Sequence, residues 1–328
     1  MRILFRLACS AICMLGIAAQ QLSAQPTKIR VANGTTLDIL TIPDLRIFEH
    51  FLKAEAGIDS EVTYVPGAVR AIQALISDQA EIGIATLNAG LAAVLQGQDI
   101  IVFSLASGAR PYLVMTAHNE IKDLKDLEGK TVGVISLVDS TYYLPVMQMR
   151  QSGVDVEKIK WQPVGGGAGR GNALIAGGVQ AAMFQVAQAL DLESKGPFHI
   201  LTPPKERNEL IFKAFWAKRS FLEANPEIAT AIAKSQLRAT REALDKETFI
   251  KLAAPQLAPM TQDMVEKAYG ILLEMGVWDP DGALLNESAG DYTIAEMVRY
   301  GVIPRPLAFE NWATDRFVKA AMAELGKR

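Results

Sequence analysis

Hydrophobic and polar positions alternate between two spacings along the first third of the chain. Short β-branched or apolar runs predict buried strands, and longer stretches with apolar residues three or four apart predict amphipathic helices. Strands are expected at 28–32, 61–65, 82–85 and 100–105, with helices between them at 43–57, 67–76 and 87–95. Strands that alternate with helices predict a parallel α/β sheet with helices on both faces.

A further strand and helix are predicted in the middle of the chain. The β-branched run 131–135 predicts a buried strand, and a hydroxyl-rich segment follows it at 136–140. Helical spacing returns from Thr141, so Ser140 or Thr141 is expected to cap that helix. A strand end beside a helix N-terminus offers N–H groups to an anion or to the polar edge of a ligand. An ordinary capped turn explains the same residues equally well.

An internal repeat indicates how the chain is organised. Val65-Pro66-Gly67, followed by Ala74-Leu75-Ile76, recurs about a hundred residues later as Val164-Gly165-Gly166 and Ala173-Leu174-Ile175. Two similar strand–helix–strand runs at this distance predict two lobes of like architecture. The segments 110–117 and 209–218 are predicted to be extended strands between the lobes, by which the chain crosses and returns. A cleft between hinged lobes is where ligands bind.

The first residues have the pattern of a secretory signal peptide. Arg2 and Arg6 precede an apolar run at 7–19, and small residues precede a cleavage site. Both cysteines, Cys9 and Cys13, lie in this segment outside any lipid-anchor context, so disulfides, thiol catalysis and cysteine metal sites are excluded from the exported form. The exported form is expected to be a soluble, unanchored periplasmic protein.

Charge excludes two classes of partner. Loss of the two arginines changes the formal charge from -3 to -5. A mildly acidic chain without a run of lysines and arginines is a poor nucleic-acid or anionic-membrane binder.

The C-terminal part is helical almost throughout, with helix starts expected near Asn225-Pro226, Asp245 and Thr261. No punctuated linker separates these helices from the rest, so they are expected to pack on the first lobe. The predicted division is a signal peptide at 1–24, a first lobe at 25–113 plus 214–328 that includes the helical tail, and a second lobe at 114–213.

Several motifs combine along nearly all of the mature chain. They include Pro66-Gly67-Ala68, the strand entry Asp126-Leu127-Glu128-Gly129-Lys130, and the hydroxyl loop Asp139-Ser140-Thr141. With them the chain resembles periplasmic substrate-binding proteins of ABC importers, in the branch that binds nitrate, sulfonates and taurine, or pyrimidine precursors of thiamine. The resemblance implies a periplasmic binding protein type II fold, in which two Rossmann-like lobes joined by a two-strand hinge close around one small molecule. It implies a monomer without cofactor or enzymatic activity, and an ABC permease and its ATPase as partners.

The resemblance also implies ligand positions on loops at strand ends that face the cleft. They fall on Thr35, Thr36, Thr86 and Asn88 in the first lobe, and on Asp139, Ser140, Thr141, Gly166, Gly167 and Gln185 in the second. Asp139 stands where many relatives have glycine. A carboxylate there disfavours a bare oxyanion and suits a ligand with an amine or another donor.

Aromatic and basic side chains are further candidates. Rings at loop or hinge positions can sandwich a flat ligand, although packing between lobes is the alternative for each; they are Tyr142, Tyr143, Phe184 and Trp216. Trp216 is preferred because the returning strand places it beside the cleft. The glycine-rich segment 165–171 lacks the ending of a phosphate loop. It is expected to be a flexible cleft loop, and Arg170 either touches the ligand or lies solvated at a helix start. The histidines lack metal-site spacing, so no metal is predicted.

The predicted function is capture of a small polar, anionic or aromatic molecule and its delivery to an ABC permease. One alternative is a ligand-sensing partner of a membrane receptor. The other is an enzyme on the same fold, of pyrimidine-synthase or menaquinone-pathway type. The synthase carries a cysteine-rich motif that the mature chain lacks. The ligand's identity is left open, with an aromatic compound favoured slightly over an oxyanion because Arg170 is the one candidate cation.

Overall fold

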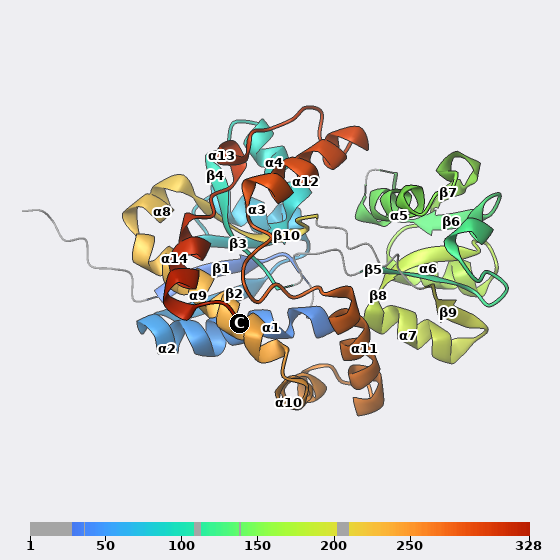
Figure 1. The fold of residues 1–328 in the computed structure, drawn as a ribbon, viewed down its shortest axis with the longest axis horizontal. Coiled ribbons are helices and arrows are strands. Elements are labelled where there is room, and N and C mark those ends of the chain that lie inside the picture. Colours follow the sequence, from blue (N-terminus) through green and yellow to red (C-terminus); the bar gives the residue numbers. More distant parts are fainter. Residues whose placement is uncertain (1–27, 36, 108–112, 138, 202–209) are drawn as a thin grey trace, which may run out of the picture.

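Two five-stranded, parallel-rich sheets form the framework of the protein (Figure 1). The computed structural model describes residues 28–35, 37–107, 113–137, 139–201 and 210–328. Its first sheet has the strand order β2-β1-β3-β10-β4, and its second has the order β7-β6-β8-β5-β9. The sheets lie toward opposite ends of the long axis (Figure 1). The predicted α/β class with two parallel-rich sheets is confirmed.

The first sheet contains mainly the N-terminal elements. Its strands are β1 (Lys28–Asn33), β2 (Asp59–Tyr64), β3 (Ile82–Thr86), β4 (Ile100–Leu105) and β10 (Lys213–Lys218). β1 pairs in parallel with β2 and β3, and β10 runs antiparallel between β3 and β4. The intervening segments are η1 (Ile39–Thr41), α1 (Ile42–Arg46), η2 (Ile47–Phe51), α2 (Leu52–Ala56), α3 (Ala68–Ile76) and α4 (Leu87–Leu95). The helix predicted at 43–57 therefore contains a π-helical turn, η2, and it ends at Gly57, whose φ of 66° is left-handed.

The second sheet repeats the first. Its strands are β5 (Leu113–His118), β6 (Thr131–Val134), β7 (Lys160–Pro163), β8 (Ala181–Gln185) and β9 (Phe198–Ile200). β6 pairs in parallel with β7 and β8, and β5 runs antiparallel between β8 and β9. The segments between them are η3 (Leu124–Leu127), α5 (Ser140–Gln151), η4 (Val156–Lys158), α6 (Gly167–Ile175) and α7 (Val186–Lys195). Because β6, β7 and β8 take the places of β1, β2 and β3, the topology agrees with the repeat in the sequence.

The two segments predicted to lie between the lobes belong instead to the sheets. β5 and β10 are each the fourth strand of their own sheet. Residues 108–112, between β4 and β5 in the sequence, and 202–209, between β9 and β10, lie outside the described residues. The inner part of β10 is Ala-Phe-Trp-Ala, which is apolar on both faces. An isolated extended strip cannot bury both faces, whereas an inner strand of a sheet can.

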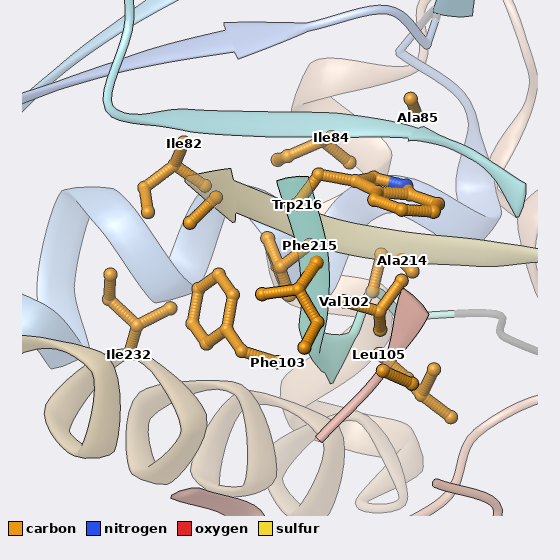
Figure 2. Close-up of a cluster of buried hydrophobic side chains, with 14 of the residues drawn as sticks. Ile82, Ile84, Ala85, Val102, Phe103, Leu105, Ala214, Phe215, Trp216 and Ile232 are labelled. Atoms are coloured by element: carbon orange, nitrogen blue, oxygen red, sulfur yellow. The ribbon is translucent and has the colours of Figure 1, made fainter. Parts of the chain in front are cut away.

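The core of the first sheet surrounds β10 (Figure 2). The ring of Phe215 lies 6.0 Å from that of Phe48 and 6.3 Å from that of Phe103, measured between centroids. The side chain of Trp216 is fully buried and lies over Gly90 of α4, where an added Cβ would come within 2.1 Å of the indole ring. The structure therefore corrects the expectation that Trp216 contacts the ligand, because its ring fills the core of one sheet.

The C-terminal helices contact strands of the first sheet and the helix α7 beside the second sheet (Figure 1). They are α8 (Arg219–Ala224), α9 (Pro226–Ala243), α10 (Lys246–Gln256), α11 (Gln262–Met275), α12 (Glu287–Arg299), α13 (Phe309–Trp312) and α14 (Arg316–Leu325). α9 and α14 pack on each other and on β4, as predicted for a tail on the first lobe. α11 instead lies against α7 and η1, and its apolar face joins the core cluster of the second sheet. The buried residues of α10 belong to the same cluster, so the expectation that the whole tail packs on the first lobe is corrected for α10 and α11. None of the described helices is long and apolar enough to cross a membrane.

Gly90 gives a direct test of the core around Trp216. We expect Gly90→Ala to lower the free energy of unfolding by about 1–3 kcal/mol, because the new methyl group would displace the buried indole. Gly270→Ala in α11 is the matched control, since an added Cβ there meets nothing within 4 Å. It should raise stability by up to about 1 kcal/mol through helix propensity. Urea unfolding of both variants measures the difference. A Gly90→Ala variant as stable as the control would contradict the packing of Trp216 on Gly90.

Candidate functional site

Polar side chains gather where the parallel strands of the first sheet end. The N–H and Oγ1 of Thr35, just after β1, donate to Asn33 Oδ1 at 2.9 and 2.6 Å. Thr86 ends β3 and precedes α4, and Asn88 lies in the first turn of that helix. The side chains of Thr86 and Asn88 are half-buried and have no hydrogen-bond partner among the described residues. Because β1 and β3 are neighbours, these positions share one edge of the sheet. Thr36 lies outside the described residues.

The loop after β6 corrects the expected helix cap. Asp139 Oδ1 accepts from the N–H of Thr141 at 2.9 Å and from its Oγ1 at 2.8 Å. Thr141 is buried, and its Oγ1 accepts from the N–H of Ile135 at 2.8 Å. Asp139 therefore caps α5, and Thr141 ties the loop to the strand end. The hydroxyl of Ser140 is half-buried and has no partner in the described part of the chain, so it remains available to a ligand.

The other predicted positions of the second lobe lie on the strands beside β6. Gly166 precedes α6 and Gly167 is its first residue, directly after β7. Gln185 ends β8 and precedes α7. The strand order β7-β6-β8 therefore brings the ends that carry Ser140, Gly167 and Gln185 to one edge of the second sheet. Gln185 corresponds to Thr86 in the first sheet, because each ends the third strand of its repeat.

Arg170 has a structural role that the sequence did not predict. Its side chain is buried, with Nε donating to Met183 O and Nη1 to Gly165 O, both at 3.0 Å. The guanidinium carbon lies 5.4 Å from the centroid of the Phe184 ring. Burial lowers the pKa of Arg170, and the charge of Asp139 acts in the opposite direction. Arg170 therefore ties the loop between β7 and α6 to β8 and is not the solvated residue of a helix start.

Three of the four aromatic candidates are core residues. Tyr143, Phe184 and Trp216 are at most 3% exposed. Tyr142 alone is half-buried, and its ring meets that of Trp161 edge-on with centroids 5.1 Å apart. Of this group only Tyr142 has ring surface left for a ligand.

A buried carboxylate holds both connections between the lobes on the first sheet. Asp44, in the first turn of α1, accepts from Lys213 Nζ with Oδ2 and from the backbone N–H of Ser107 with Oδ1, each at 3.1 Å. The side chains of Asp44 and Lys213 are only 2% and 1% exposed. Ser107 follows β4 just before the chain leaves the first sheet, and Lys213 begins β10 just after the chain returns. One side chain thus contacts the chain both where it leaves the first sheet and where it returns.

Asp38 adds a second carboxylate to this group. It precedes η1, where its Oδ1 accepts from the N–H of Thr41 at 3.1 Å. Burial raises the pKa of Asp38 from 3.8 to about 6, although Lys213 acts to lower it. Its Oδ2 is buried without a partner among the described residues, and so is Ser107 Oγ. We call Asp38, Asp44, Ser107 and Lys213 the Asp44 cluster.

The lobes meet in a narrow seam beside Asp38. Asp38, Ile39 and Leu40 line it from the first lobe, Gln185 and the start of α7 line it from the second, and Leu272 of α11 closes it. The seam has no room for a water molecule in this conformation. Gln185, predicted as a ligand residue, therefore lies near Asp38 across the boundary between the lobes.

A separate pocket of about 420 Å³ lies wholly on the first lobe, between β2 and the helical segment α1-η2. Asn33, Asp44 and Tyr64 contribute to its lining. None of the predicted ligand residues lines it. Among the described residues, no group of three or more His, Cys, Asp or Glu side chains could hold a metal ion.

The Asp44 cluster was not predicted from the sequence, although one residue pattern pointed to it. Lys213 is a lone lysine in the otherwise apolar run 210–217. A lysine in such a run must find a partner if the run is buried, because an unpaired buried charge is costly. Asp38 and Asp44 give no comparable signal, since aspartate is ordinary at helix starts.

Residues 53–248 match the family model described as NMT1/THI5 like. The curated proteins contain no match to the chain. One similar solved structure is the periplasmic aliphatic sulphonate binding protein SsuA from Escherichia coli, with 16% identity, a TM-score of 0.69, and coverage of 87% of this chain and 96% of that one. Another is the periplasmic nitrate-binding protein NrtA from Synechocystis PCC 6803, with 11% identity, a TM-score of 0.70, and coverage of 92% and 90%.

A third similar structure is a ligand-binding component of an ABC-type import system from Staphylococcus aureus, solved with zinc bound. It has 11% identity, a TM-score of 0.70, and coverage of 90% of this chain and 98% of that one. At these sequence identities the three structures are evidence for the fold alone. They confirm the predicted periplasmic binding protein fold.

The raised pKa of Asp38 predicts how stability depends on pH. Between pH 4 and 6 the folded state keeps a proton on Asp38 that the unfolded state releases, so the free energy of unfolding falls as pH rises through this range. Above pH 6, where Asp38 is charged in both states, its raised pKa corresponds to a loss of about 2–3 kcal/mol in the free energy of unfolding. Asp38→Asn keeps an acceptor for Thr41 and removes the charge. We expect it to raise the melting temperature at pH 7.5, with the gain shrinking toward pH 4.

Asp245→Asn is the matched control, because Asp245 also caps a helix but is exposed. Hydrogen bonds from the side chain and backbone of Thr248 lower the pKa of Asp245, so its carboxylate stabilises the fold above its unfolded pKa, and this contribution is lost as pH falls. Asp245→Asn should therefore lower the melting temperature at pH 7.5. Melting curves in which both variants change stability in the same direction at pH 7.5 would contradict the assignment for Asp38.

Proposed function

Because the chain belongs to the NMT1/THI5-like family, we propose that it is an exported solute-binding protein of an ABC importer. It captures a small organic molecule between its two lobes in the periplasm and delivers it to a membrane permease. The family match and the import-system proteins among the similar structures support the solute-binding role. The predicted signal peptide, outside the described residues, supports export.

The observation that carries the proposal is the set of unpartnered polar side chains at strand ends in both sheets. Thr86 and Asn88 in the first lobe and Ser140 in the second are half-buried and make no hydrogen bond in the described part of the chain. Ligands bind at the carboxyl ends of strands in open α/β sheets, where such groups can meet a ligand. Two like sheets that are connected twice can bring both edges against one solute.

These groups favour binding over catalysis. Hydroxyl and amide groups donate and accept hydrogen bonds, and the backbone N–H groups at Gly166 and Gly167 can add donors. The exported form has no cysteine, which removes the thiol chemistry expected of a synthase on this fold. We therefore propose transport without a chemical step.

Ser140 provides the test. In a thermal-shift screen of the mature protein, a solute at about a hundred times its dissociation constant should stabilise the fold by roughly 2.7 kcal/mol. Ser140→Ala should weaken binding of that solute by up to about tenfold, since one neutral hydrogen bond is lost, and leave the ligand-free melting temperature unchanged.

Ser194→Ala is the control, because the Ser194 hydroxyl donates to Asp191 O on the outer surface of α7. It should bind like wild type. Equal affinities for wild type and Ser140→Ala, measured by titration calorimetry, would remove Ser140 from the site. A screen in which no small solute binds would contradict the proposed function itself.

A further inference from the structure

The Asp44 cluster carries one more negative charge than its contacts neutralise. It contains two carboxylates, Asp38 and Asp44, and one ammonium group, that of Lys213. Asp44 uses both oxygens, one for Lys213 and one for the N–H of Ser107. Asp38 is 9% exposed and makes no ion pair among the described residues. A buried carboxylate of this kind favours a cation or a strong hydrogen-bond donor beside it.

Two polar atoms of the cluster have nothing to bind in the described part of the chain. They are Asp38 Oδ2 and Ser107 Oγ, both fully shielded from solvent. An unsatisfied buried acceptor costs free energy, and a charged one costs more. Native proteins tolerate such costs mainly at functional sites, where the missing partner is the ligand.

Asp38, with its unsatisfied oxygen, lies where the two lobes meet. Asp38 follows the end of β1, on the edge that carries Thr35 and Thr86. It also lines the seam that Gln185 and α7 line from the other lobe. The seam is too narrow for a solute in this conformation, so Oδ2 becomes accessible only when the lobes move apart there. Residues that shift between lobe positions are well placed to couple ligand recognition to closure.

We propose that Asp38 is the residue by which the first lobe recognises the solute, and that the solute carries an ammonium, amidinium or other N–H donor that binds Oδ2. The inference rests on the proposed function and adds a substrate class to it: a cationic or zwitterionic molecule, and not a bare oxyanion. The donor would neutralise the excess negative charge of the cluster.

Matched pairs of solutes test this selectivity. Titration calorimetry compares 4-(aminomethyl)benzoate with 4-methylbenzoate, and 3-aminopropanesulfonate with propanesulfonate, on the mature protein at pH 7.5. We expect the amine of at least one pair to bind roughly 10- to 100-fold more tightly than its partner, the range of one charge-assisted hydrogen bond. Asp38→Asn should abolish this preference, and Asp245→Asn should retain it.

The outcomes separate the inference from the function on which it rests. Equal binding of both members within every pair that wild type binds, or an amine preference that survives in Asp38→Asn, overturns the role of Asp38 while supporting a solute-binding protein. Such a result would mean that a water molecule satisfies Oδ2. Failure of all four compounds to bind overturns the predicted substrate class, and if a wider screen also finds no solute, it overturns the proposed function as well.

Discussion

The structure depends on one buried ion pair, between Asp44 and Lys213. The Asp44 carboxylate reaches the last described residue before the chain leaves the first sheet and the strand by which it returns. A buried pair of this kind adds little to stability compared with well-packed apolar residues, but removing one partner leaves an uncompensated charge. Its main effect is therefore on position, because it joins the point where the chain leaves the first sheet to the strand by which it returns.

The residues around this ion pair hold the chain in position, but they also include an unsatisfied buried carboxylate oxygen, which costs free energy. Asp38 lies close enough for Lys213 and Asp44 to influence its ionisation, yet neither satisfies its Oδ2. Around it, Thr86 at the end of β3 and Asn88 in α4 carry polar groups without partners among the described residues, and Ser140 after β6 carries another in the second sheet. In the proposed function, the repeat of one topology places two polar edges against a single solute, while the cores behind them, such as that around Trp216 (Figure 2), supply the stability.

Periodicity predicted the strands and helices well, because a buried parallel strand requires an apolar run that can be read directly. It failed where the same hydrophobic pattern suits two different positions in the fold. The run that contains Trp216 suits a crossing segment or an inner strand, and Gly90 on a distant helix decides between them. The apolar face of α11 does not reveal which lobe it covers. Asp38 and Asp44 resemble ordinary helix-start residues until folding brings Lys213 beside them.

A double-mutant cycle on Asp44→Asn and Lys213→Met, followed by urea unfolding, tests the central pair most directly. Loss of Asp44 alone should cost about 3–5 kcal/mol, and the double variant should cost clearly less than the two single variants together. The exposed pair Lys28–Glu61, more than half exposed on both sides, should show a much smaller coupling in the same cycle, because solvent screens its charges. Additive effects at Asp44 and Lys213 would contradict the view that this pair holds the crossings in place.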